Sequence, residues 1–422
     1  MQHEIITSID FGSKKIAAAV ATCGSEEMDI LGVKSCKSNG IEKGLVTDVE
    51  KCRESVLGLL NELEVATRKQ IKNISIGIST RNVTIKESRT IIEISEEIIE
   101  EKHIKKGIEK IKKEVLVSEN RCVIDVLINF FILDGKVIHD NIIGSNGSKF
   151  EMNCTVVIAS KEDIEKYYDI FAKSKYKIKN IILNIFSGRQ IFLNEKNYIG
   201  DVALVDIGAG ETDICLFNNG IPKYVGYIPL GGNNISNDLA ICAQFSFMEA
   251  DNIKVIYAGN YESLYKDESL QDSIEVGTAK VSKELFYEVT NARIEEILTH
   301  INMELKKTGH YDRICSIILY GDGMSYFENI NSFIRSIIDI KSKFVSNADL
   351  GIRNSENITS LALAKDVYDR LKLIGDNDNT QMVEQVHTKK NEAEFLLNDN
   401  ENENEEKSSI VDKMKTLLGK IF

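Results

Sequence analysis

Short runs of β-branched and aliphatic residues alternate with amphipathic stretches over the first 375 residues of the chain. Apolar runs bounded by turn residues predict strands, and apolar positions that recur every three to four residues predict helices. Because the two kinds of segment alternate, the pattern predicts an α/β fold. The expected strands are Ile5–Ile9, Ile16–Thr22, Ile74–Ile78, Val123–Leu133, Thr155–Ala159, Val202–Val205, Ile214–Phe217 and Ile314–Leu319. The expected helices are Val49–Glu62, Glu96–Lys113, Lys161–Ser174, Asn233–Gln244, Lys280–Lys307 and Ile358–Lys372.

Composition narrows the class of protein. At 422 residues the chain is too long for one hydrophobic core, which predicts two to three domains or a two-lobed fold. The net charge of −13, from 52 basic and 65 acidic side chains, opposes binding to phosphate backbones, so nucleic acid is not expected as a partner. The chain shows neither a signal peptide nor an apolar run long enough to span a membrane, which predicts a cytoplasmic location. Eight cysteines without metal-site spacing predict buried, reduced thiols.

The composition changes after Gly375. Residues 376–407 contain ten Asp or Glu against three Lys and few apolar side chains, which predicts a disordered acidic linker. Residues 408–422 become apolar and basic again, and a capping box at Ser409 predicts the start of a helix. At roughly 20 Å this helix is too short to cross a bilayer, but its amphipathic pattern suits a membrane interface, with docking on the protein's own body or on a partner as the alternative. The expected membrane residues are Ile410, Val411, Met414, Leu417, Leu418, Ile421 and Phe422, flanked by Lys413, Lys415 and Lys420.

An internal repeat is the most informative feature of the chain. The segment ITSIDFGSKKIAAAVA, which begins at Ile6, recurs in pattern as VALVDIGAGETDICLF from Val202. Both segments predict a strand, an Asp-x-Gly turn and a second strand. The repeat therefore predicts two lobes of similar core topology, each opening with a β-hairpin.

Glycine-rich hairpin turns let backbone N–H groups approach phosphate oxygens closely, and two such turns facing each other are able to clamp a polyphosphate. Ordinary hairpins with glycine in their turns are the structural alternative. Carboxylates at the ends of both first strands suit a hydrated Mg²⁺ ion that bridges to phosphates, which points to Asp10 and Asp206. The expected phosphate-binding residues are Gly12, Ser13 and Lys15 in the first turn and Gly208, Gly210 and Thr212 in the second.

These two turns, together with ILYGDGMSYF from Ile318, resemble the phosphate and adenosine loops of the actin, Hsp70 and sugar-kinase superfamily. Within that superfamily, four other segments are similar to segments of the bacterial cell-division FtsA family. They are GIEKGLVTDVEKC, ISIGIST, IPLGGNNISNDLA and EADNIK. The resemblance implies an actin-like two-lobed ATPase fold with ATP and Mg²⁺ as cofactors. It adds to the nucleotide site Gly231, Gly232, Asp251, Lys254, Gly321 and Gly323, and it places Asp238 near the phosphates.

The resemblance also implies a domain order. The first lobe core is expected at 1–80 and 160–198, an inserted FtsA-type subdomain at 81–159, and the second lobe core at 199–230 and 301–375. A peripheral subdomain of the second lobe is expected at 231–300, followed by the linker at 376–407 and the membrane-targeting helix at 408–422.

As a function, the resemblance implies a protein that polymerises at the inner face of the cell membrane at the division site and anchors FtsZ filaments there. Arg293 and Glu296 match positions that contact the C-terminal peptide of FtsZ. Three residues depart from the family pattern, because Asn184 replaces a glutamate, Glu211 enters the second phosphate loop and Asp322 enters the adenosine loop. An amide cannot act as a general base, so at most a slow ATPase is expected. The alternatives are a carbohydrate kinase, an Hsp70 relative or a pilus-assembly platform protein.

Overall fold

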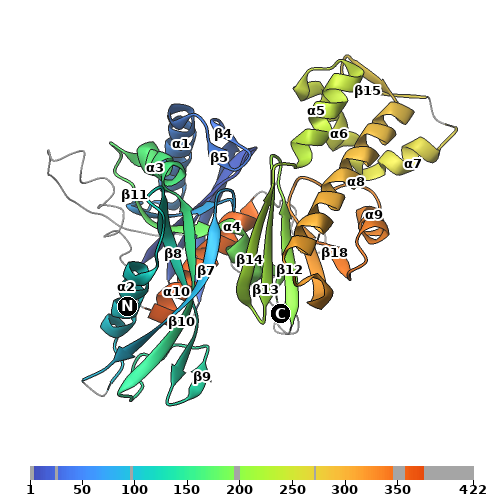
Figure 1. Ribbon diagram of the computed structural model, residues 1–422. Helices are drawn as coiled ribbons and strands as arrows, with labels where there is room; N and C mark the ends of the chain where they lie inside the picture. Colours follow the sequence, from blue (N-terminus) through green and yellow to red (C-terminus); the bar gives the residue numbers. More distant parts are fainter. Residues whose placement is uncertain are drawn as a thin grey trace.

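The computed structural model describes residues 4–23, 27–95, 98–193, 200–269, 272–345 and 357–374. Its core consists of two five-stranded sheets, one in each lobe, with helices α4 and α10 between them (Figure 1). Buried side chains from both sheets join one continuous apolar cluster, in which Phe186 of α4 meets Phe217 of the second sheet. The two lobes therefore pack against each other through α4.

The two core sheets share one topology. In each, the first strand lies at the centre, with the second and third strands antiparallel on one side and the fourth and fifth parallel on the other. The first sheet consists of β3 (Met28–Lys37), β2 (Lys15–Cys23), β1 (Ile5–Phe11), β6 (Asn73–Ile78) and β11 (Lys177–Leu183). The second consists of β14 (Ile221–Ile228), β13 (Thr212–Asn218), β12 (Asp201–Ile207), β17 (Ile314–Tyr320) and β18 (Ser342–Phe344).

The opening hairpins of the two sheets also share one register. Asp10 pairs with Ala17 across the first hairpin, and Asp206 pairs with Asp213 across the second, seven residues further along in each case. Each turn closes with the same bond, because the N–H of Gly12 donates to the carbonyl of Lys15 at 3.1 Å and the N–H of Gly208 donates to that of Glu211 at 2.9 Å. The structure thus confirms the two-lobed fold that the repeat predicts.

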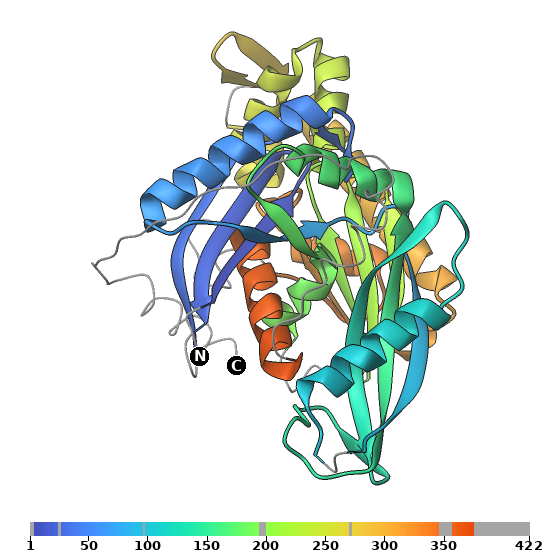
Figure 2. The ribbon, with the colours of Figure 1, turned by 90° about the vertical axis from the view of Figure 1, so that its left-hand side faces the viewer.

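Helices cover both faces of the first sheet (Figure 2). Helix α1 buries Val56, Leu60 and Leu63 against it, at the three- and four-residue spacing of an amphipathic helix. Helix α10 packs on the opposite face, where Leu363 and Val367 meet Ile6 of β1. The helices of the first lobe are α1 (Val49–Thr67), α3 (Lys161–Phe171), α4 (Asn184–Phe192) and α10 (Ile358–Ile374), with a small hairpin of β4 (Ile41–Glu42) and β5 (Leu45–Val46).

A separate subdomain is inserted between β6 and α3. It contains one helix on a four-stranded sheet and has its own apolar core, which includes Ile104, Phe131 and Phe150. The expected helix start at Glu96 is wrong, because α2 begins at Glu101. Ile98 forms a β-bridge with Asn146, which keeps the backbone extended just before the helix. Its elements are β7 (Thr84–Glu93), α2 (Glu101–Glu114), β8 (Arg121–Leu133), β9 (Lys136–Ile138) and β10 (Lys149–Ser160).

A helical subdomain extends the second lobe at the upper right of Figure 1. The expected helix start at Lys280 is wrong, since residues 279–282 pair with β15 as strand β16 and Ser282 caps the N-terminus of α8. The second-lobe helices and this hairpin are α5 (Gly232–Ala243), α6 (Phe247–Tyr257), η1 (Ala258–Asn260), α7 (Tyr261–Lys266), β15 (Ser273–Val276), β16 (Ala279–Ser282), α8 (Lys283–Lys307), η2 (Tyr311–Arg313) and α9 (Ile330–Ile337).

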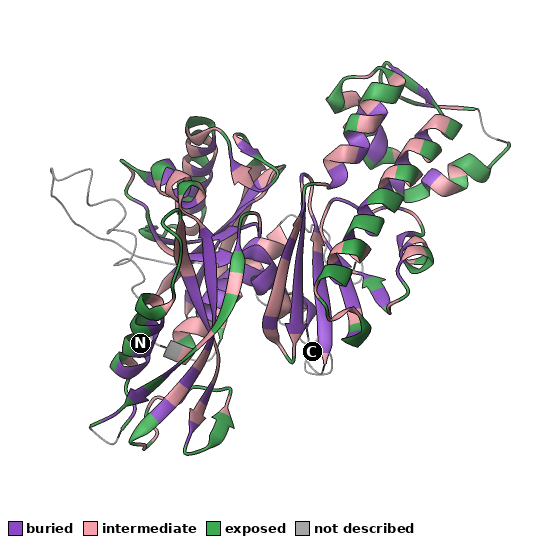
Figure 3. Ribbon diagram, viewed as in Figure 1, coloured by how far each residue is buried: buried purple, intermediate pink, exposed green. Residues whose placement is uncertain are grey.

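Burial is concentrated in the central strands and in the helix faces that cover them (Figure 3). All eight cysteines are free thiols, but the expectation that they are all buried is wrong, because Cys242 and Cys315 are exposed. No helix of the described residues has both the length and the apolar character needed to cross a membrane. The expected acidic linker and C-terminal amphipathic helix lie outside the described residues.

Candidate functional site

The two Asp-x-Gly turns meet directly between the lobes. The hydroxyl of Ser13 donates to Glu211 Oε2 at 2.6 Å, and the N–H of Gly44 donates to Ser13 Oγ at 3.2 Å. A Cβ atom at Gly210 would lie 2.8 Å from Ser13 Oγ, so this contact requires glycine. The structure therefore brings the two expected phosphate turns together, although their positions are 198 residues apart in the sequence.

Two further glycine pairs surround the second turn. The N–H of Gly232 donates to the carbonyl of Gly208 at 3.0 Å, and the N–H of Gly323 donates to that of Ile207 at 2.8 Å. A Cβ atom at Gly323 would lie 2.3 Å from the Gly208 carbonyl oxygen, and one at Gly231 would lie 2.5 Å from the same atom. These glycines allow three backbone segments to converge on one turn. Neighbouring backbone fills the space that their missing side chains leave.

Gly321 lies at the same junction, directly after β17. Its φ is +104°, which favours glycine, and a Cβ atom there would lie 2.4 Å from Asp206 Oδ1. The loop after β17 thus runs against the carboxylate at the end of β12, as an element that completes this site would.

Buried carboxylates line the junction between the lobes. Burial raises the pKa of Asp10 to about 6, in spite of opposing effects from Lys15 and from a hydrogen bond with Asn184. Burial, together with the charges of Asp213 and Asp10, raises the pKa of Asp206 well above its ordinary value. Negative charge is in excess here, which is the condition that a bound cation relieves.

Asp213 belongs to the same group but was not among the expected site residues. It lies opposite Asp206 in the hairpin and accepts hydrogen bonds from the hydroxyls of Ser79 at 2.8 Å and Thr80 at 2.6 Å. Burial raises its pKa to about 6 against these bonds. The Thr-Asp pair at the end of the second turn was the available signal, but the partners 134 and 133 residues away could not be identified from sequence.

Glu211 and Asp322, two of the departures from the family pattern, take the partners expected for phosphate. Glu211 accepts the Ser13 hydrogen bond, and the ammonium of Lys15 forms an ion pair with Asp322 at 2.6 Å. Burial and the charge of Asp213 raise the pKa of Glu211 to about 7, so its carboxyl is partly protonated at neutral pH. A nucleotide phosphate would have to compete with both carboxylates.

A second charged group connects Lys14 to helices α5 and α6. Lys14 pairs with Asp251 at 2.9 Å, and Asp251 pairs with Lys254 at 2.8 Å. The buried ammonium of Lys254 also donates to the carbonyl of Gly232 at 2.9 Å and to Ser236 Oγ at 2.6 Å. Burial would raise the pKa of Asp251, but Lys254, Lys14 and Ser236 together lower it to about 2. The ion pair of Asp251 and Lys254 thus fixes α6 against the N-terminus of α5, beside the second turn.

Asn184 lies at the start of α4, where the family resemblance implies an acid. Its amide Nδ2 donates to Asp10 Oδ1 at 2.8 Å. Its Oδ1 is buried and has no hydrogen-bond partner in the structure. That oxygen lies against Gly77, where a Cβ atom would come within 1.9 Å of it, so Asn184 requires glycine at this position of β6.

Four further expected residues bond to other parts of the second lobe. The Thr212 hydroxyl donates to the carbonyl of Leu230 at 2.8 Å, where it supports the approach to α5. Asp238 accepts from Arg293 Nε at 2.5 Å, and Arg293 also pairs with Glu296 one turn along α8. Arg293 and Glu296 therefore lie together at the contact between α5 and α8.

The fit to Mg²⁺ depends on two carboxylates. Among the described residues, no group of three His, Cys, Asp or Glu side chains is arranged to hold a metal ion directly. Mg²⁺ commonly keeps several waters and binds one or two carboxylates together with substrate phosphates. Asp10 and Asp206, whose pKa values are raised by burial and by neighbouring carboxylates, supply the two carboxylates that such a hydrated ion needs.

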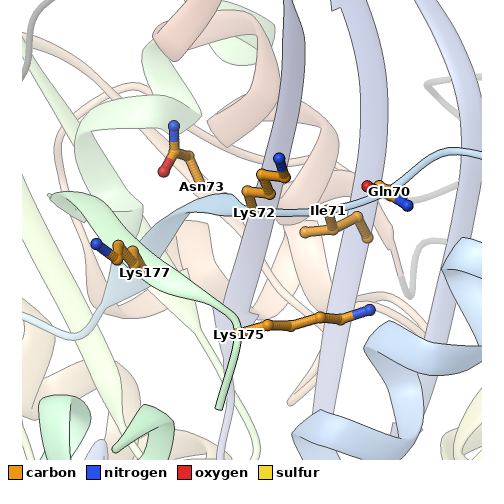
Figure 4. Close-up of a pocket in the computed structure, with 6 residues that line it drawn as sticks. All are labelled: Gln70, Ile71, Lys72, Asn73, Lys175 and Lys177. Carbon is orange, nitrogen blue, oxygen red and sulfur yellow. The ribbon is translucent and has the colours of Figure 1, made fainter. Parts of the chain in front are cut away.

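A pocket of about 430 Å³ opens elsewhere, at the far end of the first sheet (Figure 4). It lies where β6 and β11 begin, whereas the Asp-x-Gly turn follows the end of the neighbouring parallel strand β1. The pocket is therefore separate from the junction of the two turns. It is lined by Gln70, Ile71, Lys72, Asn73, Lys175 and Lys177.

Comparison with known families identifies relatives over most of the chain. The family described as cell division protein FtsA matches residues 203–364, and the SHS2 domain inserted in FtsA matches residues 81–158. The cell division protein FtsA of Bacillus subtilis is 24% identical over 369 residues, which cover 86% of this chain and 83% of the relative. That of Borreliella burgdorferi is 25% identical over 353 residues, which cover 81% and 84%.

Solved structures show the same fold at low sequence identity. The PilM-PilN type IV pilus biogenesis complex is 12% identical with a TM-score of 0.57, and the match covers 87% of this chain and 98% of that chain. MreB5 of Spiroplasma citri bound to ADP is 11% identical with a TM-score of 0.50, and the match covers 87% and 97%. These likenesses establish the actin-like fold and no more.

Proposed function

The chain belongs to the FtsA family of cell-division proteins, and from this premise we propose that it binds Mg-ATP between its lobes and links FtsZ filaments to the membrane. The observation that carries the nucleotide proposal is the pair of hairpins with one register and one turn bond, held in contact by Ser13 and Glu211. Two equivalent turns that meet at a carboxylate-lined junction suit a polyphosphate with its cation.

In this proposal the residues of the junction exchange partners when the nucleotide enters. Ser13 and Lys15 leave Glu211 and Asp322 and donate to phosphate oxygens. Asp10 and Asp206 hold the hydrated Mg²⁺, whose charge offsets that of the phosphates. Gly12 and Gly208 keep each turn tight enough for its backbone to approach the ligand. Glycines hold the loop before α5 and the loop after β17 against the second turn; they are Gly231, Gly232, Gly321 and Gly323. The ion pair of Asp251 and Lys254 fixes α6 beside these loops.

The proposed turnover is slow. At the start of α4, Asn184 donates a hydrogen bond to Asp10 and presents an amide where a base would be needed. An adaptor whose shape depends on the bound nucleotide fits this arrangement better than a rapid enzyme does. A turnover on the order of 10 per second, typical of efficient enzymes, would contradict the adaptor proposal.

The partner contacts are proposed on two surfaces. Arg293 and Glu296 on α8 form the candidate site for the C-terminal peptide of FtsZ, and the exposed Ile241 lies one turn along α5 from Asp238, the partner of Arg293. An apolar side chain beside a charged pair suits an amphipathic peptide. Residues 409–422 are the proposed anchor at the inner face of the membrane, and self-association into filaments would strengthen their hold through avidity.

Calorimetry tests the nucleotide proposal. The wild type should bind ATP in a magnesium-dependent way, and Asp206→Ala should weaken that binding because one of the two cation ligands is lost. Absence of ATP binding by the wild type at every magnesium concentration would overturn it. Co-pelleting with FtsZ, with and without anionic liposomes, tests the adaptor role, and deletion of 409–422 should move the protein to the soluble fraction with ATP binding intact.

A further inference from the structure

Three exposed lysines lie together at one end of the first sheet and are called the basic rim below. They come from the segment that follows α1 and the segment that follows α3. These segments are joined, because the N–H of Lys177 donates to the carbonyl of Lys72 at 2.8 Å. The basic rim consists of Lys72, Lys175 and Lys177.

The basic rim carries more positive charge than its surroundings neutralise. Lys175 pairs with Glu64 at 2.5 Å, but no carboxylate in the described parts of the chain pairs with Lys72 or Lys177. Two other cations in the same segments, Arg68 and Lys173, follow the C-termini of α1 and α3, where the helix dipole favours positive charge. That explanation does not extend to Lys72 and Lys177, which stand where strands β6 and β11 begin.

The shape of the cluster excludes one small anion as its natural ligand. In Figure 4 the side chains of Lys175 and Lys177 point apart, so their ammonium groups do not converge on one point. Ammonium groups spread over an exposed surface match an extended array of negative charges better than a single phosphate. A plane of anionic lipid head groups is such an array.

The last described helix, α10, ends between this end of the sheet and the inserted subdomain. Leu371, near the end of α10, packs against a cluster with Ile6 at the start of β1 and Cys23 at the end of β2. Lys179, two residues beyond the basic rim, pairs with Glu4 just before β1. Asn141 of the inserted subdomain donates to the Lys372 carbonyl at 2.9 Å, so the residues after Ile374, with the proposed membrane anchor among them, continue from a point between that subdomain and the sheet end that carries the basic rim.

We propose that the basic rim is a second membrane contact that binds anionic lipid head groups and orients the body on the bilayer. The inference rests on the proposed function, in which residues 409–422 are the anchor. The first Asp-x-Gly turn lies at the opposite end of the same sheet, roughly 16 Å away along a strand of this length. The basic rim thus turns the junction between the lobes away from the bilayer.

Flotation of the full-length protein with liposomes tests the inference. Vesicles of phosphatidylcholine alone are compared with vesicles containing phosphatidylglycerol, at low salt and at about 0.5 M salt, where charges are strongly screened. The test variant is Lys72→Glu with Lys177→Glu. The matched control is Lys280→Glu with Lys341→Glu, two exposed lysines of the second lobe with the same change in net charge. Circular dichroism and ATP binding check that every variant is folded.

We expect the basic-rim variant to bind anionic vesicles about 10- to 30-fold more weakly than the wild type, since each basic side chain near such a surface contributes a factor of roughly five. The control should bind like the wild type, and high salt should remove the difference between the wild type and the basic-rim variant. Equal binding of these two proteins to anionic vesicles at low salt would overturn the inference. The acidic residues 376–407 would then be the next candidate for the negative charge that neutralises the basic rim. Deletion of 409–422 in the wild type reports separately on the anchor, so failure of the proposed function remains distinguishable.

Discussion

Replacing Asp10 with Asn should stabilise the nucleotide-free protein while weakening its response to Mg-ATP. Burial raises the pKa of Asp10 from 3.8 to about 6. Between these two pH values the folded state binds more protons than the unfolded chain, so stability falls as pH rises through this window and stays low above it. Asn cannot ionise and still accepts the hydrogen bond from Asn184, so it avoids this loss.

The expected gain follows from the size of the pKa shift. A shift of about two units corresponds to roughly 3 kcal/mol at pH 7.5, as an upper limit, and to about half of that at pH 5. Urea denaturation in the presence of EDTA, at pH 5 and at pH 7.5, measures both values. Asp140→Asn, at an exposed position of the inserted subdomain, is the control and should change stability by less than about 0.5 kcal/mol.

Mg-ATP should reverse the ranking of the two proteins. The wild type gains stability from the ligand in proportion to its affinity, whereas Asp10→Asn lacks one of the two carboxylates proposed to hold the cation. If Asp10→Asn instead destabilises the nucleotide-free protein by the same amount at both pH values, the carboxylate supports the fold without a charge penalty. The reasoning from burial would then be refuted.

Three further outcomes are expected from substitutions at the same junction and behind it. The ATP affinity of the wild type, relative to that of Glu211→Thr, should fall as pH rises from 6 to 8, because Glu211, whose pKa burial raises to about 7, gains charge in this window. Nucleotide titrations of both proteins measure this ratio, and a ratio that does not change with pH would exclude Glu211 as a competitor. Asn184→Glu should raise phosphate release in a colorimetric assay, unless the position does not match the acid of the family. Arg370→Met leaves the buried carboxylate of Asp125 without its two 2.8 Å bonds and should cost about 3 to 5 kcal/mol in denaturation, against less than about 0.5 for Arg335→Met at an exposed position.

The fold was predictable where local pattern determined it. The hairpins of both lobes consist of apolar runs around a glycine turn, so their strands and their repetition follow from sequence alone. The bounds of strand β7 could not be predicted, because it is an edge strand whose sequence, TIKESRTIIE, buries few side chains and shows a weak alternation. The N-terminus of α2 was misplaced because a β-bridge made through tertiary contact determines where the helix begins.

Most residues of the site could be predicted from the sequence, but the bonds between them could not. The departures at Glu211 and Asp322 read as charges that repel phosphate, whereas the structure shows them bonded to Ser13 and Lys15, 198 and 307 residues away. The pKa of Glu211, and thus its charge at neutral pH, depends on burial by the opposite lobe. Such facts follow from the way the lobes close, which no local pattern contains.

A series of polar contacts continues from the nucleotide junction into the inserted subdomain. Helix α4 makes two of them, since its first residue bonds the carboxylate of β1 and its second turn bonds α10. Helix α10 in turn pairs with the sheet of the inserted subdomain. The residues, in order, are Asp10, Asn184, Arg189, Asp366, Arg370 and Asp125. Asn184 and Arg189 both belong to the short helix α4. Any shift of α4 that accompanies nucleotide binding therefore changes its contact with α10 as well. The inserted subdomain is therefore connected by polar contacts to the junction of the two turns through α4 and α10, and a change in ATP affinity in the Arg370→Met variant would show that this connection couples the two.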